Sequence, residues 1–291
     1  TTEWPPVGQS IGHRVGYHVR AGKHDLLEED WQFFADFEGY ELQGMRSTGI
    51  AVGRSGSRVD AVPARFRPVQ DPLPVKPPEG AVVLFGDGSE GAAKFTAMDG
   101  GPLDWKVDGG SLVVGTSKGH ANHAVSTETF RDADIHAEFM VDPHAKGNSG
   151  LYIHGHYEMQ IFDSFGVEPP TEQDEGSLYR FAKPLVNASR KAGEWQVYDI
   201  RYVAPRRGAD GKVKTPGRIT AWLNGKLVQD GVEFDEPRSP YVPYRHGVTD
   251  HLRAVKKRLD ETGEGPLFLQ DHGSPARFRN VWIRRLDAGG T

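Results

Sequence analysis

The stretch of residues 151–163 carries two imidazoles, a carboxylate and an amide at alternate positions. Side chains of a strand alternate between its two faces, so residue parity sorts them. The even positions are Tyr152, His154, His156, Glu158, Gln160 and Phe162, whereas the odd positions are mainly apolar. Such a polar face between aromatic residues predicts a site for acid–base chemistry on a sugar, whose ring stacks on the aromatic side chains. The alternative is an ordinary half-exposed strand with a polar outer face.

Three further groups can join this predicted site. Asp163 has the wrong parity, and it reaches the face only if a β-bulge lies between Gln160 and Asp163. In an expected strand over 134–142, His136 and Glu138 share one face, and they reach the same groove if the two strands are neighbours. The strand end at Leu269–Gly273 places Gln270 and His272 on one side.

The pattern after Gly80 predicts an all-β domain. Alternating runs bounded by turn residues indicate strands over 81–85, 111–115, 134–142, 150–163, 195–203, 217–223, 226–230, 266–271 and 276–286. Asn224-Gly225 between two such runs predicts a hairpin. Strands at this density favour an antiparallel sandwich or jelly roll. One helix is expected, over 251–261.

Residues 1–79 are predicted to form an N-terminal extension that precedes a jelly-roll domain over 80–291. The apolar spacing and the capping signals of 25–40 predict a short helix in it. Six prolines within 63–78 predict an extended connector, or an arm that lies on the domain. We place the domain boundary near Glu79.

Composition excludes several classes of protein. The 291 residues include no Cys, which removes disulfides, thiolate metal sites and cysteine nucleophiles. A formal net charge of -5 argues against a nucleic-acid partner. No apolar run approaches the ~20 residues of a membrane span. Any bound metal must therefore rely on oxygen and imidazole ligands.

Short motifs from about Val82 to Leu286 occur in the order found in a known family. They are Leu84–Gly88, Trp105–Gly109, Gly147–Tyr152, Tyr157–Asp163, Gly176–Tyr179, Gly193–Gln196, Leu223–Gly225, Gly265–Gln270, Asp271–Gly273 and Phe278–Asn280. In these motifs the chain resembles the 3-keto-disaccharide hydrolase family. The resemblance implies a concanavalin-like jelly roll of two curved antiparallel sheets. It also implies that the substrate is a glycoside already oxidised to a ketone at C3.

A 3-ketone acidifies the C2 proton, so a base can remove it while the group at C1 leaves. Water then adds to the product. This scheme needs a base near C2, an acid for the leaving oxygen, and donors or a cation for the enolate.

The resemblance and the motif positions together suggest specific roles. Glu158 and His154 form the central pair, in which one group is the base or a metal ligand. The other expected catalytic residues are His272, Tyr179 and Lys183. The expected substrate-binding residues are His156, Gln160, Asp163, Asn148, Glu138, Gln270 and Tyr152. A divalent cation such as Ca²⁺, Mn²⁺ or Zn²⁺ would bind at His154 and Glu158, metal-free catalysis stays open, and no organic cofactor is expected.

Two other functions stay open. A retaining laminarinase-type glycosidase shares the architecture, but its two carboxylates stand in E-x-D-x-x-E, whereas this chain has Glu158-x-Gln160-x-x-Asp163. A non-catalytic carbohydrate-binding module is the other alternative. The expected partner is a carbohydrate, and the oligomeric state is left open. The start at Thr1 rather than Met and the carbohydrate role suggest a periplasmic or secreted bacterial protein.

Overall fold

The computed structural model describes residues 10–11, 17–18, 66–86, 94–115, 121–144, 147–235, 242–245 and 248–286. The chain divides into two compact units, Thr1–Pro63 and Ala64–Thr291. In the first unit, β1 (Ser10–Ile11) pairs with β2 (Tyr17–His18) in an antiparallel manner. The helix predicted at 25–40 lies outside the described residues.

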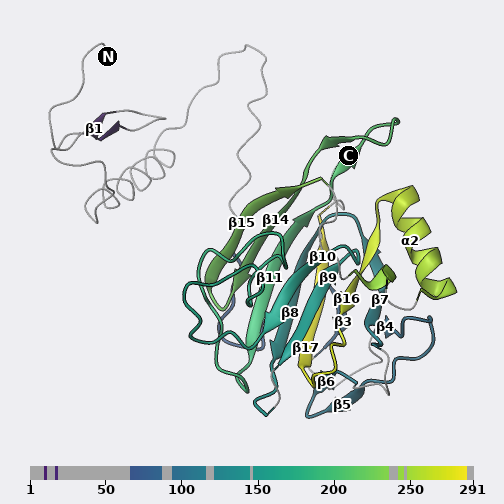
Figure 1. Cartoon of the computed structure of the whole chain (residues 1–291), viewed down its shortest axis with the longest axis horizontal. Helices are drawn as coiled ribbons and strands as arrows, with labels where there is room; N and C mark the ends of the chain where they lie inside the picture. Colours follow the sequence, from purple (N-terminus) through teal and green to yellow (C-terminus); the bar gives the residue numbers. More distant parts are fainter. Residues whose placement is uncertain are drawn as a thin grey trace. The chain divides into compact units, whose positions relative to one another are not determined.

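The second unit contains two antiparallel sheets (Figure 1). One has five strands in the spatial order β10 (Tyr157–Phe162), β9 (Asn148–Ile153), β16 (Gly265–Leu269), β7 (Ala124–Phe130) and β4 (Phe95–Thr96). The other has eight strands. Seven follow the order β15 (Lys226–Phe234), β14 (Gly217–Leu223), β11 (Gln196–Val203), β8 (Ala133–Met140), β17 (Arg277–Arg285), β6 (Ser111–Val113) and β5 (Lys106–Asp108), and β3 (Val82–Phe85) pairs with β17.

Four further elements belong to the second unit. They are the β12 (Arg206–Arg207) and β13 (Val213–Thr215) ribbon, the 3-10 turn η1 (Pro243–Arg245) and the helix α2 (Asp250–Thr262). Within the described residues, no helix is long and apolar enough to cross a membrane.

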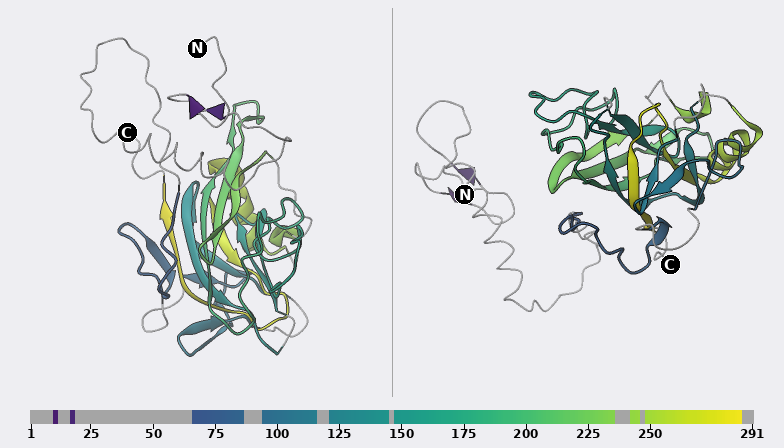
Figure 2. Two further views of the ribbon diagram at one scale, coloured as in Figure 1. Left: turned by 90° about the vertical axis from the view of Figure 1, so that its left-hand side faces the viewer. Right: turned by 90° about the horizontal axis from the view of Figure 1, so that it is seen from below.

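The core lies between the two sheets, which face each other (Figures 1 and 2). Alternate residues of each strand supply it, such as Ile135 and Phe139 of β8 and Leu151 and Ile153 of β9, all of which are buried. Burial of alternate apolar side chains on two facing sheets is the usual basis of a β-sandwich. The predicted all-β sandwich is therefore confirmed.

Most of the predicted elements are present. Asn224 and Gly225 both have positive φ, 49° and 83°, as a two-residue turn between β14 and β15 requires. The predicted helix is α2, which Thr249 caps at its N-terminus and Gly263 ends. Strand β7 was not predicted, because Ser126 to Thr129 interrupts its apolar alternation with four consecutive polar residues.

The expected single strand over 150–163 is wrong. The segment is a hairpin in which β9 and β10 flank the turn His154 to His156. His154 and Gly155 have φ of 55° and 68°, and the backbone N–H of His156 donates to Ile153 O at 3.0 Å. The apolar and polar alternation continues through the turn, which hid it from pattern analysis.

Residues 66–78 lie as an arm on the outer face of the eight-stranded sheet. The Gln70 amide donates to Asp199 Oδ2 at 2.8 Å and to Trp222 O at 3.2 Å. The backbone N–H of Val75 donates to Glu138 Oε1 at 2.8 Å. The boundary between the two compact units lies after Pro63. The predicted boundary near Glu79, between the N-terminal extension and the jelly-roll domain, stays a prediction.

Candidate functional site

The β9–β10 hairpin brings Glu158, Gln160 and Tyr152 to one face of the five-stranded sheet. Glu158 pairs with Tyr152 and Gln160 pairs with Gly150 across the two strands. Directly opposite residues of an antiparallel pair share a face. The turn has three residues, so even positions before and after it stay on the same face. The face itself was therefore predicted correctly, although the strand was not.

Gln270 joins this face from the next strand. It follows β16 directly, its backbone N–H donates to Gly150 O at 2.9 Å, and its Nε2 donates to Tyr152 Oη at 2.7 Å. Glu158, Gln160, Tyr152 and Gln270 are all buried, with exposed fractions of 5% or less. We call these four residues the Glu158 cluster.

Glu158 is the carboxyl group of this cluster. Its side chain lies over Gly150, where an added Cβ would stand 2.8 Å from Oε1. Burial raises the pKa of Glu158 to about 8, although hydrogen bonds with Tyr152 and Gln270 lower it in part. A carboxyl group with such a pKa can both give and accept a proton near neutral pH.

Three buried oxygens of the cluster have no hydrogen-bond partner in the described part of the chain. They are Oε2 of Glu158, Oε1 of Gln160 and Oε1 of Gln270. Buried polar atoms are normally paired, because an unpaired one costs about 1–3 kcal/mol. Three such acceptors on one face suit a ligand that presents several hydroxyl donors.

His123 lies beside the cluster and was not found from the sequence. Its Nδ1 accepts the backbone N–H of Asp271 at 3.0 Å, which places the proton of the neutral ring on Nε2. The ring centroids of His123 and Tyr152 are 5.9 Å apart. His123 directly precedes β7, so the polar run that concealed this strand also concealed the residue.

His154 does not share the face with Glu158, and this part of the prediction is wrong. Because His154 occupies the turn, its ring enters the space between the sheets, where Nε2 lies 2.8 Å from Phe130 O and Nδ1 lies 3.3 Å from Tyr202 Oη. Burial lowers the pKa of His154 to about 3, so the ring is neutral. His154 is a satisfied core histidine.

His156 ends the same turn, and its role as a substrate-binding residue stays a prediction. Its ring lies 5.4 Å from that of Tyr244, and its buried Nδ1 has no partner in the described residues. Burial lowers the pKa of His156 to about 4.

Glu138 lies on the other sheet, so the expectation that it shares a groove with Glu158 is wrong. β8 pairs with β11 and β17, not with β9 or β10. Glu138 bonds with Arg279 Nε at 2.8 Å, Asn280 Nδ2 at 2.9 Å and the backbone of Val75. His136, on the same strand, bonds with Asp199 at 2.8 Å.

The other predicted site residues are less closely associated with the cluster. Asn148 shares the even face of β9, and the Tyr179 backbone N–H donates to Glu158 O at 2.8 Å. Lys183 and His272 are exposed. Asp163 is exposed too. The β9–β10 register stays regular to Phe162, so these strands do not contain the bulge that would bring Asp163 to the face. The roles of all five residues stay predictions.

The predicted metal ligands His154 and Glu158 do not fit a shared ion, because the His154 ring points away into the core. No group of three or more His, Asp or Glu side chains could hold a metal in the part of the chain that the structure describes. The unpaired oxygens of Glu158, Gln160 and Gln270 are of the type that hard cations such as Ca²⁺ accept, and the set lacks the imidazole typical of Zn²⁺.

Comparison with known proteins gives a family for this domain. The model of the 3-keto-alpha-glucoside-1,2-lyase-like domain matches residues 80–284. A crystal structure of a candidate glycosyl hydrolase from Parabacteroides distasonis is 30% identical, with a TM-score of 0.60, and the match covers 81% of this chain and all of that one. A second such protein from that organism is 19% identical, with a TM-score of 0.47, and covers 72% and 95%.

A curated relative matches over a short stretch only. It is carbohydrate esterase MZ0003 from an unidentified prokaryote, 33% identical over 42 residues. These residues make up 14% of this chain and 10% of the esterase, so this chain matches about a tenth of that protein's length.

Proposed function

We propose, on the premise that this chain belongs to the family of 3-keto-α-glucoside-1,2-lyase-like domains, that it is a carbohydrate-active enzyme that cleaves 3-keto glycosides. The observation that carries the proposal is the Glu158 carboxyl group. It is buried, its pKa is raised to about 8, and unpaired amide oxygens of Gln160 and Gln270 lie on the same face. Acid–base groups with pKa values near the working pH are typical of catalytic sites.

The reaction balances without an oxidant or reductant. The base takes the proton from C2, and the electron pair of the C2–H bond passes into an enolate with the C3 ketone. The enolate then reforms the ketone as a C1–C2 double bond develops and the C1–O bond breaks. The leaving oxygen takes up a proton. Addition of water across the double bond, with OH at C1 and H at C2, gives the free 3-keto sugar.

Glu158 in its ionised form is the proposed base for the C2 proton. A carboxylate with a pKa near 8 is a stronger base than an ordinary one, and it is still partly ionised at neutral pH. The protonated form can afterwards return the proton to the leaving oxygen or to C2. Tyr152 and Gln270 orient Glu158 through their hydrogen bonds to it.

Stabilisation of the enolate requires donors near the ketone. Tyr179 and Lys183 remain the proposed residues for this role, and the neutral His123 ring beside Tyr152 is a further one. A divalent cation, if one binds, would use oxygens of Glu158, Gln160 and Gln270, and it would polarise the ketone as a Lewis acid.

The retaining two-carboxylate mechanism has less support. Such enzymes place their carboxyl groups ~5–5.5 Å apart across the scissile bond. Asp163, the second acid of the sequence motif, has the opposite parity to Glu158 and lies exposed beyond the end of β10. The alternative would return if an unoxidised glucan were hydrolysed with retained anomeric configuration.

Mass spectrometry of the products of a 3-keto disaccharide in H₂¹⁸O tests the proposal. An enzyme of the proposed type releases the aglycone and gives either an unsaturated 3-keto sugar or a 3-keto sugar with ¹⁸O at C1. Parallel reactions with and without chelator test the cation. Binding without turnover of both the native and the 3-keto disaccharide would overturn the enzymatic proposal in favour of a binding module.

A further inference from the structure

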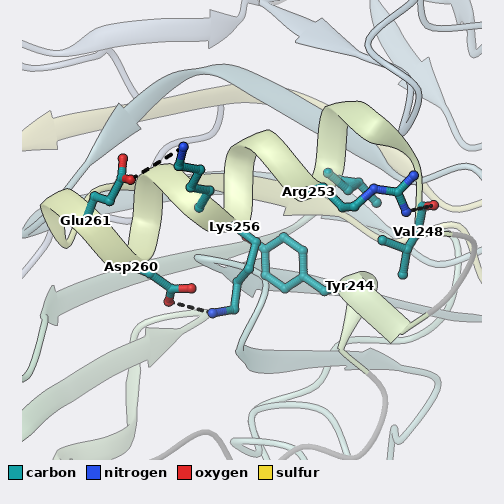
Figure 3. Close-up of a pocket in the computed structure, with 8 residues that line it drawn as sticks. Tyr244, Val248, Arg253, Lys256, Asp260 and Glu261 are labelled. Atoms are coloured by element: carbon teal, nitrogen blue, oxygen red, sulfur yellow. Dashed lines mark hydrogen bonds and ion pairs between the residues drawn. The ribbon is translucent and has the colours of Figure 1, made fainter. Parts of the chain in front are cut away.

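A pocket of about 450 Å³ lies along helix α2, beside Tyr244 of η1 (Figure 3). Its lining residues are Tyr244, Val248, Leu252, Arg253, Lys256, Lys257, Asp260 and Glu261. The walls combine an aromatic ring and aliphatic side chains with charged groups of both signs.

The pocket adjoins the face that carries the Glu158 cluster. Two of its lining residues, Tyr244 and Leu252, pack with Tyr152 and Phe268 in one apolar cluster on the outer face of the five-stranded sheet. Phe268 pairs with Tyr152, which in turn pairs with Glu158. Helix α2, which lines the pocket, contacts β16. In the sheet, β16 lies two strands from β10, which carries Glu158, so these two strands are about 10 Å apart.

The charged side chains of the pocket are neutralised in pairs. Lys256 pairs with Asp260, and Lys257 pairs with Glu261. Arg253, the fifth charged lining residue, pairs with Asp250 at the start of the helix. Such pairs present donors and acceptors without a net charge, which suits a neutral hydroxylated ligand rather than an anion.

The adjacent imidazole of His156 adds an unused polar group. Its ring lies 5.4 Å from that of Tyr244, which lines the pocket. Nδ1 is buried without a partner in the described residues. A buried ring nitrogen in this position can bond with a ligand hydroxyl.

We infer that the pocket along α2 and Tyr244, with His156 beside Tyr244, is the subsite for the leaving group, and that it binds a second, neutral sugar ring. The inference rests on the proposed function, because it places the oxidised sugar at Glu158. It assigns Tyr244 to contact with the sugar face, and it assigns His156 and the Lys256–Asp260 pair to its hydroxyls. These residues then determine preference for a disaccharide over a glycoside with a small leaving group.

The ratio of kcat/KM for 3-keto-trehalose to that for methyl 3-keto-α-glucoside tests the subsite. Val248→Trp fills the pocket from an exposed position, so the fold should tolerate it. We expect this variant to lower the ratio about ten-fold, equivalent to 1.4 kcal/mol of lost binding. Lys256→Ala and His156→Ala should each lower it about five-fold, as loss of one hydrogen bond does. Val248→Trp and Lys256→Ala should leave kcat/KM for the methyl glycoside unchanged.

Lys214→Ala is the matched control, because Lys214 forms an exposed pair with Asp210 at the same i,i+4 spacing, in the β12–β13 ribbon. It should leave the ratio unchanged. Equal losses on both substrates, or an unchanged ratio in Val248→Trp, would overturn the subsite.

A binding measurement separates the subsite from the proposed reaction. If the wild type cleaves neither substrate, the reaction fails, and titration with trehalose followed by backbone amide resonances decides the subsite alone. Shifts at residues 250–262 that disappear in Val248→Trp support it. The absence of shifts there in the wild type overturns it.

Discussion

Two polar clusters lie on the outer faces of the two sheets, and they differ in how their charges are satisfied. On the eight-stranded sheet, Glu138 is bonded to Arg279, Asn280 and Val75, and His136 is bonded to Asp199. On the five-stranded sheet, Glu158 has only neutral neighbours in its cluster, and three oxygens there lack partners among the residues that the structure describes.

The difference fits a structural role for Glu138 and the functional role proposed for Glu158. The arm of residues 66–78 covers Glu138 and its neighbours and supplies some of their hydrogen bonds. The pKa of Glu138 is lowered, because its bonds with His136, Asn280, Val75 and Arg279 outweigh burial. The pKa of Glu158 is raised by burial without an ionic partner. Similar residue types thus have a lowered carboxyl pKa on one sheet and a raised one on the other.

The largest expected effect is that of Glu158→Gln. The amide has nearly the same shape but cannot take the C2 proton, so kcat should fall about 10²–10⁴-fold. The thermal unfolding midpoint should not fall, because the amide, unlike the carboxyl group, cannot ionise when the chain unfolds. Release of glucose from 3-keto-trehalose measures the rate. Unchanged turnover would contradict the role of Glu158.

Glu138→Ala should have the opposite profile. Loss of this carboxylate removes the ionic partner of Arg279 and one of the hydrogen bonds of Asn280, and we expect the free energy of unfolding to fall by about 3 kcal/mol. Turnover per folded molecule should stay at the wild-type value. Urea denaturation gives the free energy of unfolding. The rate divided by the concentration of folded protein gives the turnover per folded molecule. A loss of kcat with unchanged stability would place Glu138 in the site after all.

A second buried carboxyl group, that of Glu175, should contribute to the pH dependence of stability. Glu175, in the loop between β10 and β11, also has a pKa raised to about 8 by burial. Folded protein keeps both protons, whereas the unfolded chain loses them above its ordinary carboxyl pKa of about 4.5. Stability should therefore fall as pH rises between about 5 and 8, by up to 1.4 kcal/mol per pH unit for each group.

Glu158→Gln and Glu175→Gln should each remove about half of this slope in urea denaturation, but only Glu158→Gln should abolish turnover. In the wild type, kcat/KM should rise with pH towards a plateau above about 8, as Glu158 ionises. A slope that neither variant reduces would show that Glu158 and Glu175 are ionised in the folded protein at neutral pH.

The smallest expected effect is that of Gly150→Ala. The new Cβ would stand 2.8 Å from Glu158 Oε1, so the carboxyl group must move. We expect kcat to fall about ten-fold, since small displacements of catalytic groups are costly. Gly86→Ala is the control, because no atom of the described residues lies within 4 Å of its added Cβ. Equal rates in both variants would show that the position of Glu158 is not critical.

Parity was sufficient to predict part of the site. Glu158, Gln160 and Tyr152 share a face because the turn between their strands contains an odd number of residues. His154 could not be placed by parity, since its backbone adopts a left-handed conformation that the flanking alternation does not reveal. The fold itself was predictable, because most strands keep one apolar face.

The alternation of apolar and polar residues along each strand could not predict which strands are neighbours in a sheet. Glu138 and Glu158 stand on strands with the same alternation, and only sheet order separates them. The contribution of the 66–78 arm also depends on long-range contacts, because Gln70 meets Asp199 and Trp222 far along the chain. Proline content predicted an extended segment, but it could not predict which face that segment covers.

Exchange of the C2 proton in D₂O tests whether Glu158 removes that proton. Proton NMR of methyl 3-keto-α-glucoside with the wild type should show loss of the C2 signal along with release of methanol, whereas Glu158→Gln should show neither. Glu138→Gln should behave as the wild type. Exchange and release by Glu158→Gln at the wild-type rate would contradict the account, because another group would then remove the proton.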